Sequence, residues 1–350
     1  MARRYRVGVL GLGHWYSAYR LGWTLAGYPR AELAAVACAD GARRDAFATA
    51  FGIDGHASFD ELLARGDVDI VHVCPPVAEI PEATIKAARA GKHVILGKPM
   101  AMTVAQADQM VEAVRAAGIV CLPFQGMFRL AMAGLKRRID QGEIGDLILI
   151  HAGGRWSIAE DWFNSGTPGW FVDPRQTPGG ALIDEGIYAI DQLRWLAGSE
   201  VVAVEARIAN LVHKEIPVED YGFATFTYAN GVVATLESAW TINSPRKSGP
   251  SPKENSVRKL ELVGSRGEIV LNELVGPGLS VLAAGASRWI YERPAPEYMA
   301  APAPGALDHL IDCLEGGRQP VSTIEDARTS LVTGLAAYEA ARKGAPVRLA

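Results

Sequence analysis

A carboxylate and a phenol stand four residues apart in the segment Gly179–Asp191. Asp184 and Tyr188 follow a glycine pair, Gly179-Gly180, that opens a predicted helix. Within one unbroken helix this spacing puts both side chains on one face, about a turn apart. Such a pair could take a proton from a substrate hydroxyl, whereas Asp191, nearly two turns from Asp184, favours a structural role. An ordinary amphipathic helix could carry the same residues, so the segment alone is only suggestive.

A lysine follows an apolar strand pattern at His93–Leu96, in the tripeptide Gly97-Lys98-Pro99. Loops at the carboxyl ends of parallel strands line the ligand crevice of an α/β sheet. An ammonium there could hydrogen-bond a reacting hydroxyl and favour its alkoxide. It would also lower the pKa of a nearby tyrosine, whose ordinary value is about 10. We therefore predict a proton-transfer unit of Lys98 and Tyr188, with Asp184 orienting the substrate or sharing the proton.

A glycine-rich turn, Gly11-Leu12-Gly13, follows a strand pattern at Arg6–Leu10 and precedes a helical pattern. That context is what the dinucleotide fingerprint requires. The first glycine permits the tight turn, and the second lets the backbone approach a pyrophosphate at the helix N-terminus. Tyr16 occupies the third glycine position and should loosen the contact between helix and strand. We predict a nucleotide site here that extends to His14 and Trp15.

The place that usually carries the ribose-binding acid is occupied by Cys38, at the end of the strand pattern Leu33–Cys38. Asp40 could substitute for that acid. Arg43 or Arg44 could instead pair with a 2′-phosphate, although solvated charges on a helix face explain them more simply. The choice between NAD and NADP stays open, with NAD slightly favoured.

A second turn, Cys74-Pro75-Pro76, ends the strand pattern Ile70–Val73 and either borders the nicotinamide ribose or simply terminates the strand. The predicted cofactor-binding residues are Gly11, Leu12, Gly13, His14, Trp15, Cys38, Asp40, Cys74, Pro75, Glu79, Gly97 and Lys98.

Tryptophans are dense in the segments that could line the substrate cleft: Trp156, Trp162, Trp170 and Trp240. Aromatic faces suit the C–H faces of a sugar ring, although core packing explains tryptophans more often. The predicted substrate-binding residues are Lys98, Arg155, Trp156, Trp170, Asp184 and Tyr188.

A chain of 350 residues favours two domains. Up to Phe124, short apolar strands alternate with helices, which is typical of a parallel sheet in a doubly wound fold. Longer strand patterns follow, two of them flanking Asn230-Gly231, the strongest short hairpin signal; another hairpin is expected at Ser265-Arg266-Gly267. We predict a Rossmann domain over 1–124 and an α+β domain with a mostly antiparallel sheet over 125–350. Exposed loops are expected at Lys247–Ser256 and Pro294–Pro304.

Composition excludes several classes of function. The formal net charge is −4 and no dense Lys/Arg tract exists, which argues against nucleic-acid binding. The longest apolar runs have strand length, so neither a membrane span nor a signal peptide is expected. The four cysteines, Cys38, Cys74, Cys121 and Cys313, are far apart, which favours buried free thiols in a reducing cytoplasm. No cysteine or histidine cluster has metal-ligand spacing, so no metal site is expected.

Several motifs in a fixed order resemble the Gfo/Idh/MocA family, named for glucose-fructose oxidoreductase, inositol dehydrogenase and a rhizopine-catabolism protein. They are the glycine loop, the run from Ala90 to Pro99, Gly142-Glu143-Ile144-Gly145, Gly169–Pro174, Gly179–Asp191 and Glu219-Asp220. The resemblance implies a Rossmann domain, a second domain with a large open-faced sheet, and homodimers or homotetramers formed through that sheet. It also implies NAD(P)-dependent hydride transfer at a secondary alcohol or ketone of a sugar, sugar derivative or cyclitol.

The family's catalytic lysine and aspartate fall on Lys98 and Asp184, and its acid/base position, often histidine, falls on Tyr188. The tyrosine resembles the glucose-fructose oxidoreductase and dihydrodiol/xylose dehydrogenase branches. Departures lie on the cofactor side: Gly97 replaces the usual glutamate, Cys74–Glu79 replaces Thr-Pro-Asn-x-x-His, and Cys38 stands at the ribose-binding place.

Two alternatives stay open from the sequence. One is a catalytically silent sensor of sugar or nucleotide, suggested by the atypical cofactor positions and opposed by intact Lys98, Asp184 and Tyr188. The other is an enzyme that oxidises a glycoside carbon transiently to permit elimination, and then recycles its cofactor.

Overall fold

The computed structural model describes residues 3–159, 167–241, 257–272, 278–292 and 303–349. Trp162 and the expected loop Lys247–Ser256 lie outside these residues, as does most of Pro294–Pro304. The chain divides into two compact units. The first contains residues 1–127, 160–178 and 302–328, and the second contains residues 128–159, 179–301 and 329–350.

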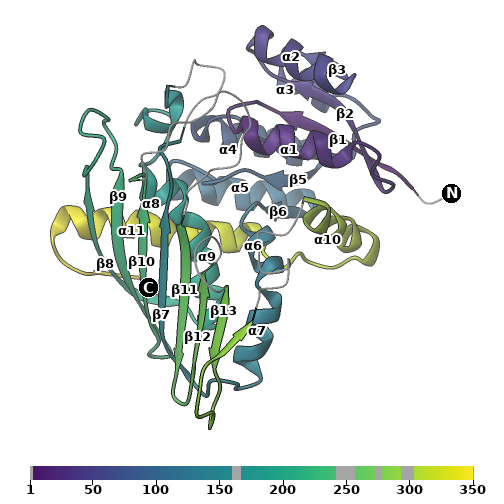
Figure 1. Cartoon of the computed structure of the whole chain (residues 1–350). Coiled ribbons are helices and arrows are strands. Elements are labelled where there is room, and N and C mark those ends of the chain that lie inside the picture. Colours follow the sequence, from purple (N-terminus) through teal and green to yellow (C-terminus); the bar gives the residue numbers. More distant parts are fainter. Residues whose placement is uncertain (1–2, 160–166, 242–256, 273–277, 293–302, 350) are drawn as a thin grey trace. The chain divides into compact units, whose positions relative to one another are not determined.

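The first unit is built on a six-stranded sheet in the order β3-β2-β1-β4-β5-β6, with every neighbouring pair parallel (Figure 1). All four residues of β4 are buried, as expected for a strand covered on both faces. This strand order is that of a Rossmann fold and confirms the prediction for this part of the chain. The strands are β1 (Tyr5–Leu10), β2 (Ala31–Ala37), β3 (Asp54–His56), β4 (Ile70–Val73), β5 (His93–Leu96) and β6 (Cys121–Pro123).

The helices of the first unit begin and end at recognisable signals. For example, α5 starts with a capping box between Thr103 and Gln106 and stops at Gly118, whose φ is 64°. A helix from the far end of the chain, α10, joins this unit, because Arg30 pairs with Asp308 at 3.0 Å and Asp312 at 2.7 Å. The helices are α1 (Trp15–Leu25), α2 (Gly41–Phe51), α3 (Phe59–Leu63), η1 (Val77–Glu79), α4 (Ile80–Arg89), α5 (Val104–Ala117), η3 (Gly169–Val172) and α10 (Ala303–Gly316).

The second unit is built on a nine-stranded sheet in the order β14-β13-β12-β11-β7-β10-β9-β8-β15. Its neighbouring strands are antiparallel except for β7 and β10, which confirms the predicted mostly antiparallel sheet. Both predicted hairpins are present, as β9–β10 around Gly231 and β11–β12. The strands are β7 (Leu147–Arg155), β8 (Val201–Ala209), β9 (Tyr221–Tyr228), β10 (Val233–Ala239), β11 (Val257–Gly264), β12 (Glu268–Asn272), β13 (Leu279–Leu282), β14 (Ile290–Glu292) and β15 (Val347–Arg348).

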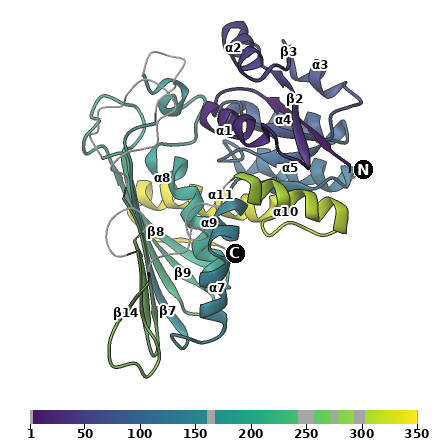
Figure 2. The ribbon, with the colours of Figure 1, turned by 45° about the vertical axis from the view of Figure 1, so that its right-hand side comes forward.

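One face of this sheet carries the core of the second unit. Helix residues such as Leu182 and Leu193 pack there against Phe226, Leu236 and Leu262 of the strands. Figure 2 shows the helices on this side of the sheet, whereas the described residues place no helix on the opposite face. The helices are α6 (Gly126–Ala131), α7 (Ala133–Asp140), α8 (Ala181–Asp184), α9 (Gly186–Ala197) and α11 (Ile324–Lys343).

The expectation of one unbroken helix through Asp184 and Tyr188 is wrong. Helix α8 ends at Asp184, and α9 begins at Gly186. The Ser238 hydroxyl donates to the Ala181 carbonyl at 2.7 Å, and the helical bond from the Glu185 N–H to that same oxygen is long, at 3.3 Å. Because two donors share one acceptor, the segment breaks between the carboxylate and the phenol.

The part of the chain that the structure describes contains no helix long and apolar enough to cross a membrane.

Candidate active site

The glycine loop of the first unit lies directly against the turn after β4. Gly11 has a φ of 78°, and a Cβ atom there would lie 2.6 Å from Pro75. A Cβ atom at Gly13 would lie 2.5 Å from the Pro76 nitrogen. Side chains at either position would therefore push the two loops apart. The structure thus brings together the predicted cofactor residues Gly11, Gly13, Cys74 and Pro75.

His14 follows the glycine loop and lies close enough to Lys98 for the lysine charge to act on its ring. Its backbone N–H donates to the Cys74 carbonyl at 2.7 Å, and its ring Nδ1 lies 2.9 Å from the Pro75 carbonyl, so Nδ1 carries the proton. The side chain is 2% exposed. Burial, and then the positive charge of Lys98, lower the pKa of His14 to about 3. His14 is therefore a neutral, fixed group beside Lys98, which is itself buried at 3% exposure.

The motif Gly169–Pro174 has a place in the first unit that the sequence did not reveal. The Trp170 indole N–H donates to the Gly13 carbonyl at 3.2 Å, and its ring lies 4.8 Å from that of His14. The Ala78 N–H donates to the Gln176 carbonyl at 3.2 Å, so the segment also holds η1, just before α4. In this unit Trp170 packs on the glycine loop, a contact distinct from the substrate contact that the sequence suggested.

Asp40, the residue predicted as a possible substitute for the ribose-binding acid, lies three residues beyond the end of β2. Asp40 caps α2: its carboxylate accepts from the Arg43 N–H and pairs with the Arg43 side chain, each at 3.1 Å. Arg44 pairs with Asp45 at 3.0 Å. Cys38 is 8% exposed, and burial raises the pKa of its thiol. Both arginines that could meet a 2′-phosphate are thus paired with acids.

The atypical Gly97 has a local structural cause. A Cβ atom there would lie 2.5 Å from the Val73 carbonyl oxygen, because β5 runs close to β4 at this point. No side chain fits without displacing backbone, so the missing glutamate reflects strand packing.

The residues of this unit fit a dinucleotide. The loop has the glycines that close backbone approach requires, and the first turn of α1 contains no acidic side chain that would repel a phosphate. Glu79 ends η1 on the exposed side of the neighbouring turn.

In the second unit, one buried carboxylate holds the start of the segment that carries Asp184. Glu219 accepts hydrogen bonds from the Gly180 and Leu182 N–H groups, both at 2.9 Å, and from the Tyr338 hydroxyl at 2.6 Å. A Cβ atom at Gly180 would collide with the Glu219 carbonyl oxygen. Gly180 is therefore needed for close contact with the Glu219 backbone, whereas a Cβ atom at Gly179 would meet the Tyr338 side chain. Asp184, at the end of α8, is 4% exposed.

Behind Tyr188, α9 is anchored by a buried ion pair. Both Asp191 oxygens accept from the Arg129 guanidinium at 2.7 Å, and the Ser330 hydroxyl donates to Asp191 at 3.2 Å. Arg129 and Asp191 side chains are 4% and 0% exposed. Asp191 therefore has the structural role that its spacing indicated.

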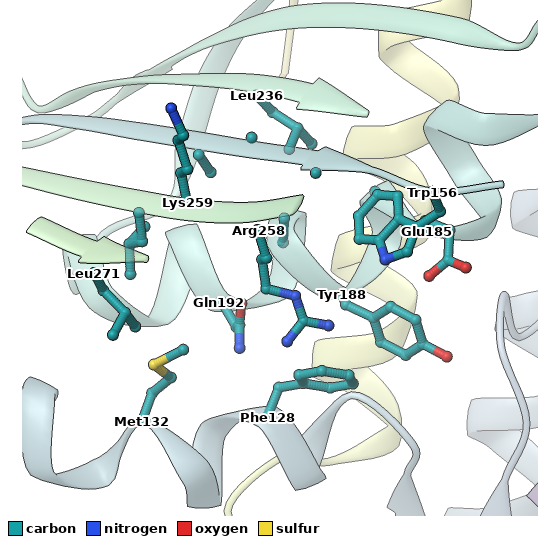
Figure 3. Close-up of a pocket in the computed structure, with 16 residues that line it drawn as sticks. Phe128, Met132, Trp156, Glu185, Tyr188, Gln192, Leu236, Arg258, Lys259 and Leu271 are labelled. Carbon is teal, nitrogen blue, oxygen red and sulfur yellow. The ribbon is translucent and has the colours of Figure 1, made fainter. Parts of the chain in front are cut away.

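Tyr188 lines a hollow between α9 and the sheet (Figure 3). The phenol ring packs against Phe128, with ring centroids 4.5 Å apart. Figure 3 shows the Tyr188 hydroxyl, Glu185 and Trp156 at one end of the hollow. The lining residues are Phe128, Met132, Ala152, Gly153, Gly154, Trp156, Glu185, Gly186, Tyr188, Ala189, Gln192, Leu236, Arg258, Lys259, Leu260 and Leu271.

Two predicted residues of this unit have different surroundings. Trp156 lines the hollow, and its ring lies so close to Gly154 that a Cβ atom there would collide with it. Arg155 is half-exposed, pairs with Glu237 at 2.9 Å and does not line the hollow. The sequence also missed Glu185 and Gln192. Both follow the helical spacing of Tyr188, at i−3 and i+4, so that spacing could have found them.

Comparison with known proteins places this architecture in a family. Residues 5–124 match a family model described as the oxidoreductase family with an NAD-binding Rossmann fold, and residues 132–270 match the GFO/IDH/MocA C-terminal domain. The chain is 27% identical to scyllo-inositol 2-dehydrogenase (NAD(+)) of Bacillus subtilis, over 100% of this chain and 97% of that protein. It is 30% identical to 1,5-anhydro-D-fructose reductase of Ensifer adhaerens, over 86% of each protein.

A solved structure gives the same result. The aldose-aldose oxidoreductase of Caulobacter crescentus, complexed with glycerol, matches with a TM-score of 0.82 and 27% identity, over 99% of this chain and all of that one. The fold and the glycine loop define an NAD(P)-dependent oxidoreductase. The chain belongs to the Gfo/Idh/MocA family.

Proposed function

We propose that this enzyme oxidises a secondary alcohol of a sugar, sugar derivative or cyclitol, or reduces the corresponding ketone. The observation that carries the proposal is Lys98, buried beside the neutral His14 and in the same unit as the glycine loop. A buried ammonium at the carboxyl edge of a Rossmann sheet suits a reacting oxygen better than a structural role. The named relatives act on an inositol and on an anhydrofructose, which supports a polyhydroxylated substrate.

The three catalytic residues have complementary tasks in this proposal. Lys98 donates a hydrogen bond to the reacting oxygen and stabilises the negative charge that develops there. Tyr188 takes the hydroxyl proton during oxidation and returns it during reduction. Asp184 accepts a hydrogen bond from the substrate and fixes its orientation. NAD(P), when bound, supplies the hydride acceptor or donor, so a CH–OH group becomes a C=O group with release of one proton.

We propose NAD as the preferred cofactor. The Asp40 carboxylate stands just beyond β2, where it would accept from ribose hydroxyls and repel a 2′-phosphate. Arg43 already pairs with that carboxylate. Cofactor contacts at Leu12, Trp15, Cys74, Pro75, Glu79 and Gly97 complete the proposed site.

The test compares Lys98→Met with Lys86→Met, a lysine whose exposed charge pairs with Asp60 and Glu82. A screen of sugars and polyols follows NADH formation, and binding of NADH is measured by fluorescence titration. We expect Lys98→Met to bind NADH normally and to lose at least a hundredfold in kcat, because removing one such donor typically costs that much. Lys86→Met should match the wild type. Near-normal turnover by Lys98→Met would contradict the proposal.

Cofactor choice is tested by thermal stability with NAD, NADH, NADP and NADPH. A ligand at a hundred times its Kd adds about 2.7 kcal/mol, enough to raise Tm by a few degrees. We expect the larger shift with the NAD pair, and Asp40→Ser should reduce the difference between the pairs. A larger shift with NADPH would reverse the assignment.

We also propose that the helix-free face of the nine-stranded sheet forms a homodimer or homotetramer in the cytoplasm. Phe223 and other side chains of β9 are exposed on this face. Light scattering coupled to gel filtration should give a mass of two or four chains.

A further inference from the structure

Strands β5 and β6 of the first unit are neighbours in its parallel sheet and end at the same edge (Figure 1). Their register pairs Leu96 with Pro123, and the Phe124 N–H donates to the Leu96 carbonyl at 2.9 Å. Lys98 follows shortly after Leu96, and Gln125 follows shortly after Pro123. Both residues therefore stand just beyond the carboxyl ends of neighbouring strands, where α/β sheets bind their ligands.

The Gln125 side chain is closed to water, and its hydrogen-bonding capacity is unused. The residue is 1% exposed. Its amide nitrogen and its amide oxygen are both buried, and neither has a hydrogen-bond partner among the residues that the structure describes. No other side chain in the described part of the chain has two such atoms. Buried polar atoms are almost always hydrogen-bonded, because leaving the bond unmade costs stability. An amide in this state, at a ligand-binding edge, indicates a ligand group that pairs with it.

The polar side chains that flank Gln125 do not satisfy its amide. A Cβ atom at the next residue, Gly126, would lie 3.2 Å from the Ser322 Cβ, yet the Ser322 hydroxyl is itself buried without a partner. On the other flank, the Phe124 ring stacks on the His72 imidazole, with centroids 6.2 Å apart. Both ring nitrogens of His72 already have partners.

The amide needs a partner that accepts one hydrogen bond and donates another. In the proposed site the glycine loop holds the pyrophosphate and Lys98 marks the reacting end of the dinucleotide. The carboxamide of nicotinamide is bonded to C3, the ring atom beside the C4 that exchanges the hydride. This group therefore belongs next to Lys98, on the side where β6 ends. Its carbonyl oxygen accepts and its NH2 group donates, which complements a glutamine amide.

We propose that Gln125 binds the carboxamide of the nicotinamide ring through two reciprocal hydrogen bonds and thereby fixes which face of the ring meets the substrate. The Gln125 Nε2–H group donates to the carboxamide oxygen, and Oε1 accepts from the carboxamide nitrogen. This inference rests on the proposed function, because Lys98 marks the reacting end of the cofactor. It adds a cofactor-orienting residue after β6, a strand for which the sequence predicted no site residue.

Calorimetric titration tests the inference without turnover. It compares NADH with ADP-ribose, which lacks the nicotinamide ring, in the wild type and in Gln125→Met, whose apolar side chain has a similar length. We expect Gln125→Met to bind NADH about tenfold more weakly and ADP-ribose within about twofold of the wild type. Ser322→Ala, which removes the neighbouring buried hydroxyl, is the matched control and should bind both ligands as the wild type does. Equal losses for NADH and ADP-ribose in Gln125→Met would overturn the inference.

A cofactor analogue identifies the group that Gln125 binds. In 3-acetylpyridine adenine dinucleotide a methyl group replaces the carboxamide NH2, so the Gln125 Oε1 atom would lose its donor. We expect the wild type to bind NAD about tenfold more tightly than this analogue, and Gln125→Met to bind the two with equal affinity. A preference for NAD that survives in Gln125→Met would contradict the inference.

Stability without ligand separates this role from a structural one. An apolar side chain in place of an unpaired buried amide leaves no polar atom unsatisfied, so the ligand-free Tm of Gln125→Met should equal or exceed that of the wild type. A lower Tm with unchanged NADH affinity would make Gln125 a structural residue and overturn the inference. If NADH binds as expected but no sugar or polyol reduces NAD, the proposed substrate class fails and the role of Gln125 stands. If neither NADH nor ADP-ribose binds, the cofactor site and this inference fail together.

Discussion

The Glu219 carboxylate accepts a hydrogen bond from the backbone N–H of Gly180 at 2.9 Å. Its other oxygen accepts from the Leu182 N–H and the Tyr338 hydroxyl. The next residue, Asp220, accepts from three N–H groups of the preceding loop, at Leu211, Val212 and His213. Both carboxylates of the Glu219-Asp220 motif therefore bind backbone N–H groups, and Glu219 fixes the start of α8, which ends at Asp184.

Removing the Glu219 carboxylate should destabilise the second unit. Glu219→Ala leaves two buried backbone N–H groups without acceptors, and each such group costs about 1–3 kcal/mol. Glu219→Gln keeps one acceptor oxygen and should lose less. Urea unfolding measures both, with Tyr338→Phe as the control that removes one donor and leaves the backbone contacts. A Glu219→Ala protein as stable as the wild type would contradict this role.

Much of the first unit is predictable from the sequence because its signals are local. The apolar runs predicted both ends of β4 and of β5 correctly, and the glycine loop lies between β1 and α1, as the fingerprint requires. The short elements β3 and α3 were not predicted. Strand β3 has only three residues, and two of them are exposed, so it has no apolar pattern. The break at Glu185 could not be predicted, because it depends on Ser238, a residue of a distant strand.

For the buried Arg129–Asp191 ion pair, removing one charge should destabilise the protein more than removing both charges. Asp191→Leu or Arg129→Met leaves one charge buried without its partner, which typically costs about 3–5 kcal/mol. The double variant Arg129→Met with Asp191→Leu removes both charges and should recover part of the loss. Chemical denaturation of the four proteins gives the coupling energy. Additive losses would contradict strong coupling between these side chains.

The first unit should lose stability as the pH falls from 7 toward 5. Burial lowers the pKa of His14 to about 3 and of His72 to about 4, whereas an unfolded histidine titrates near 6.5. The unfolded chain therefore binds protons that the folded chain does not, so stability is present above pH 6.5 and declines as pH falls toward 4. The loss of unfolding free energy that the two histidines cause together amounts to about 4 kcal/mol by pH 5.

Calorimetric scans across this pH range measure the effect. His72→Gln should reduce the pH dependence of Tm by about half relative to the wild type, because one of the two buried imidazoles is gone. A wild-type Tm that does not change between pH 7 and 5 would contradict the proposed protonation states.

The candidate site was less predictable than the fold, because side chains from distant segments complete it. Nothing in the residues around Trp170 shows that its indole would reach Gly13. Arg258 and Gln192 become related only when β11 and α9 face one another across the hollow. Residue types and their positions in the sequence predicted Lys98, Asp184 and Tyr188, whereas contacts across a sheet or between loops carry no short-range pattern.

Restoring the residue that is usual in the family should harm this protein. In Gly97→Glu the new Cβ atom would meet the Val73 carbonyl oxygen at 2.5 Å, so β4 and β5 would have to separate. Overpacking of this kind costs about 1–3 kcal/mol. Gly97→Ala introduces the same Cβ without the charge and should lose a similar amount, whereas Gly91→Ala tests a glycine with open space around it but a φ of 68°. Thermal unfolding ranks the three variants, and a Gly97→Glu protein at least as stable as the wild type would show that the strands can yield here.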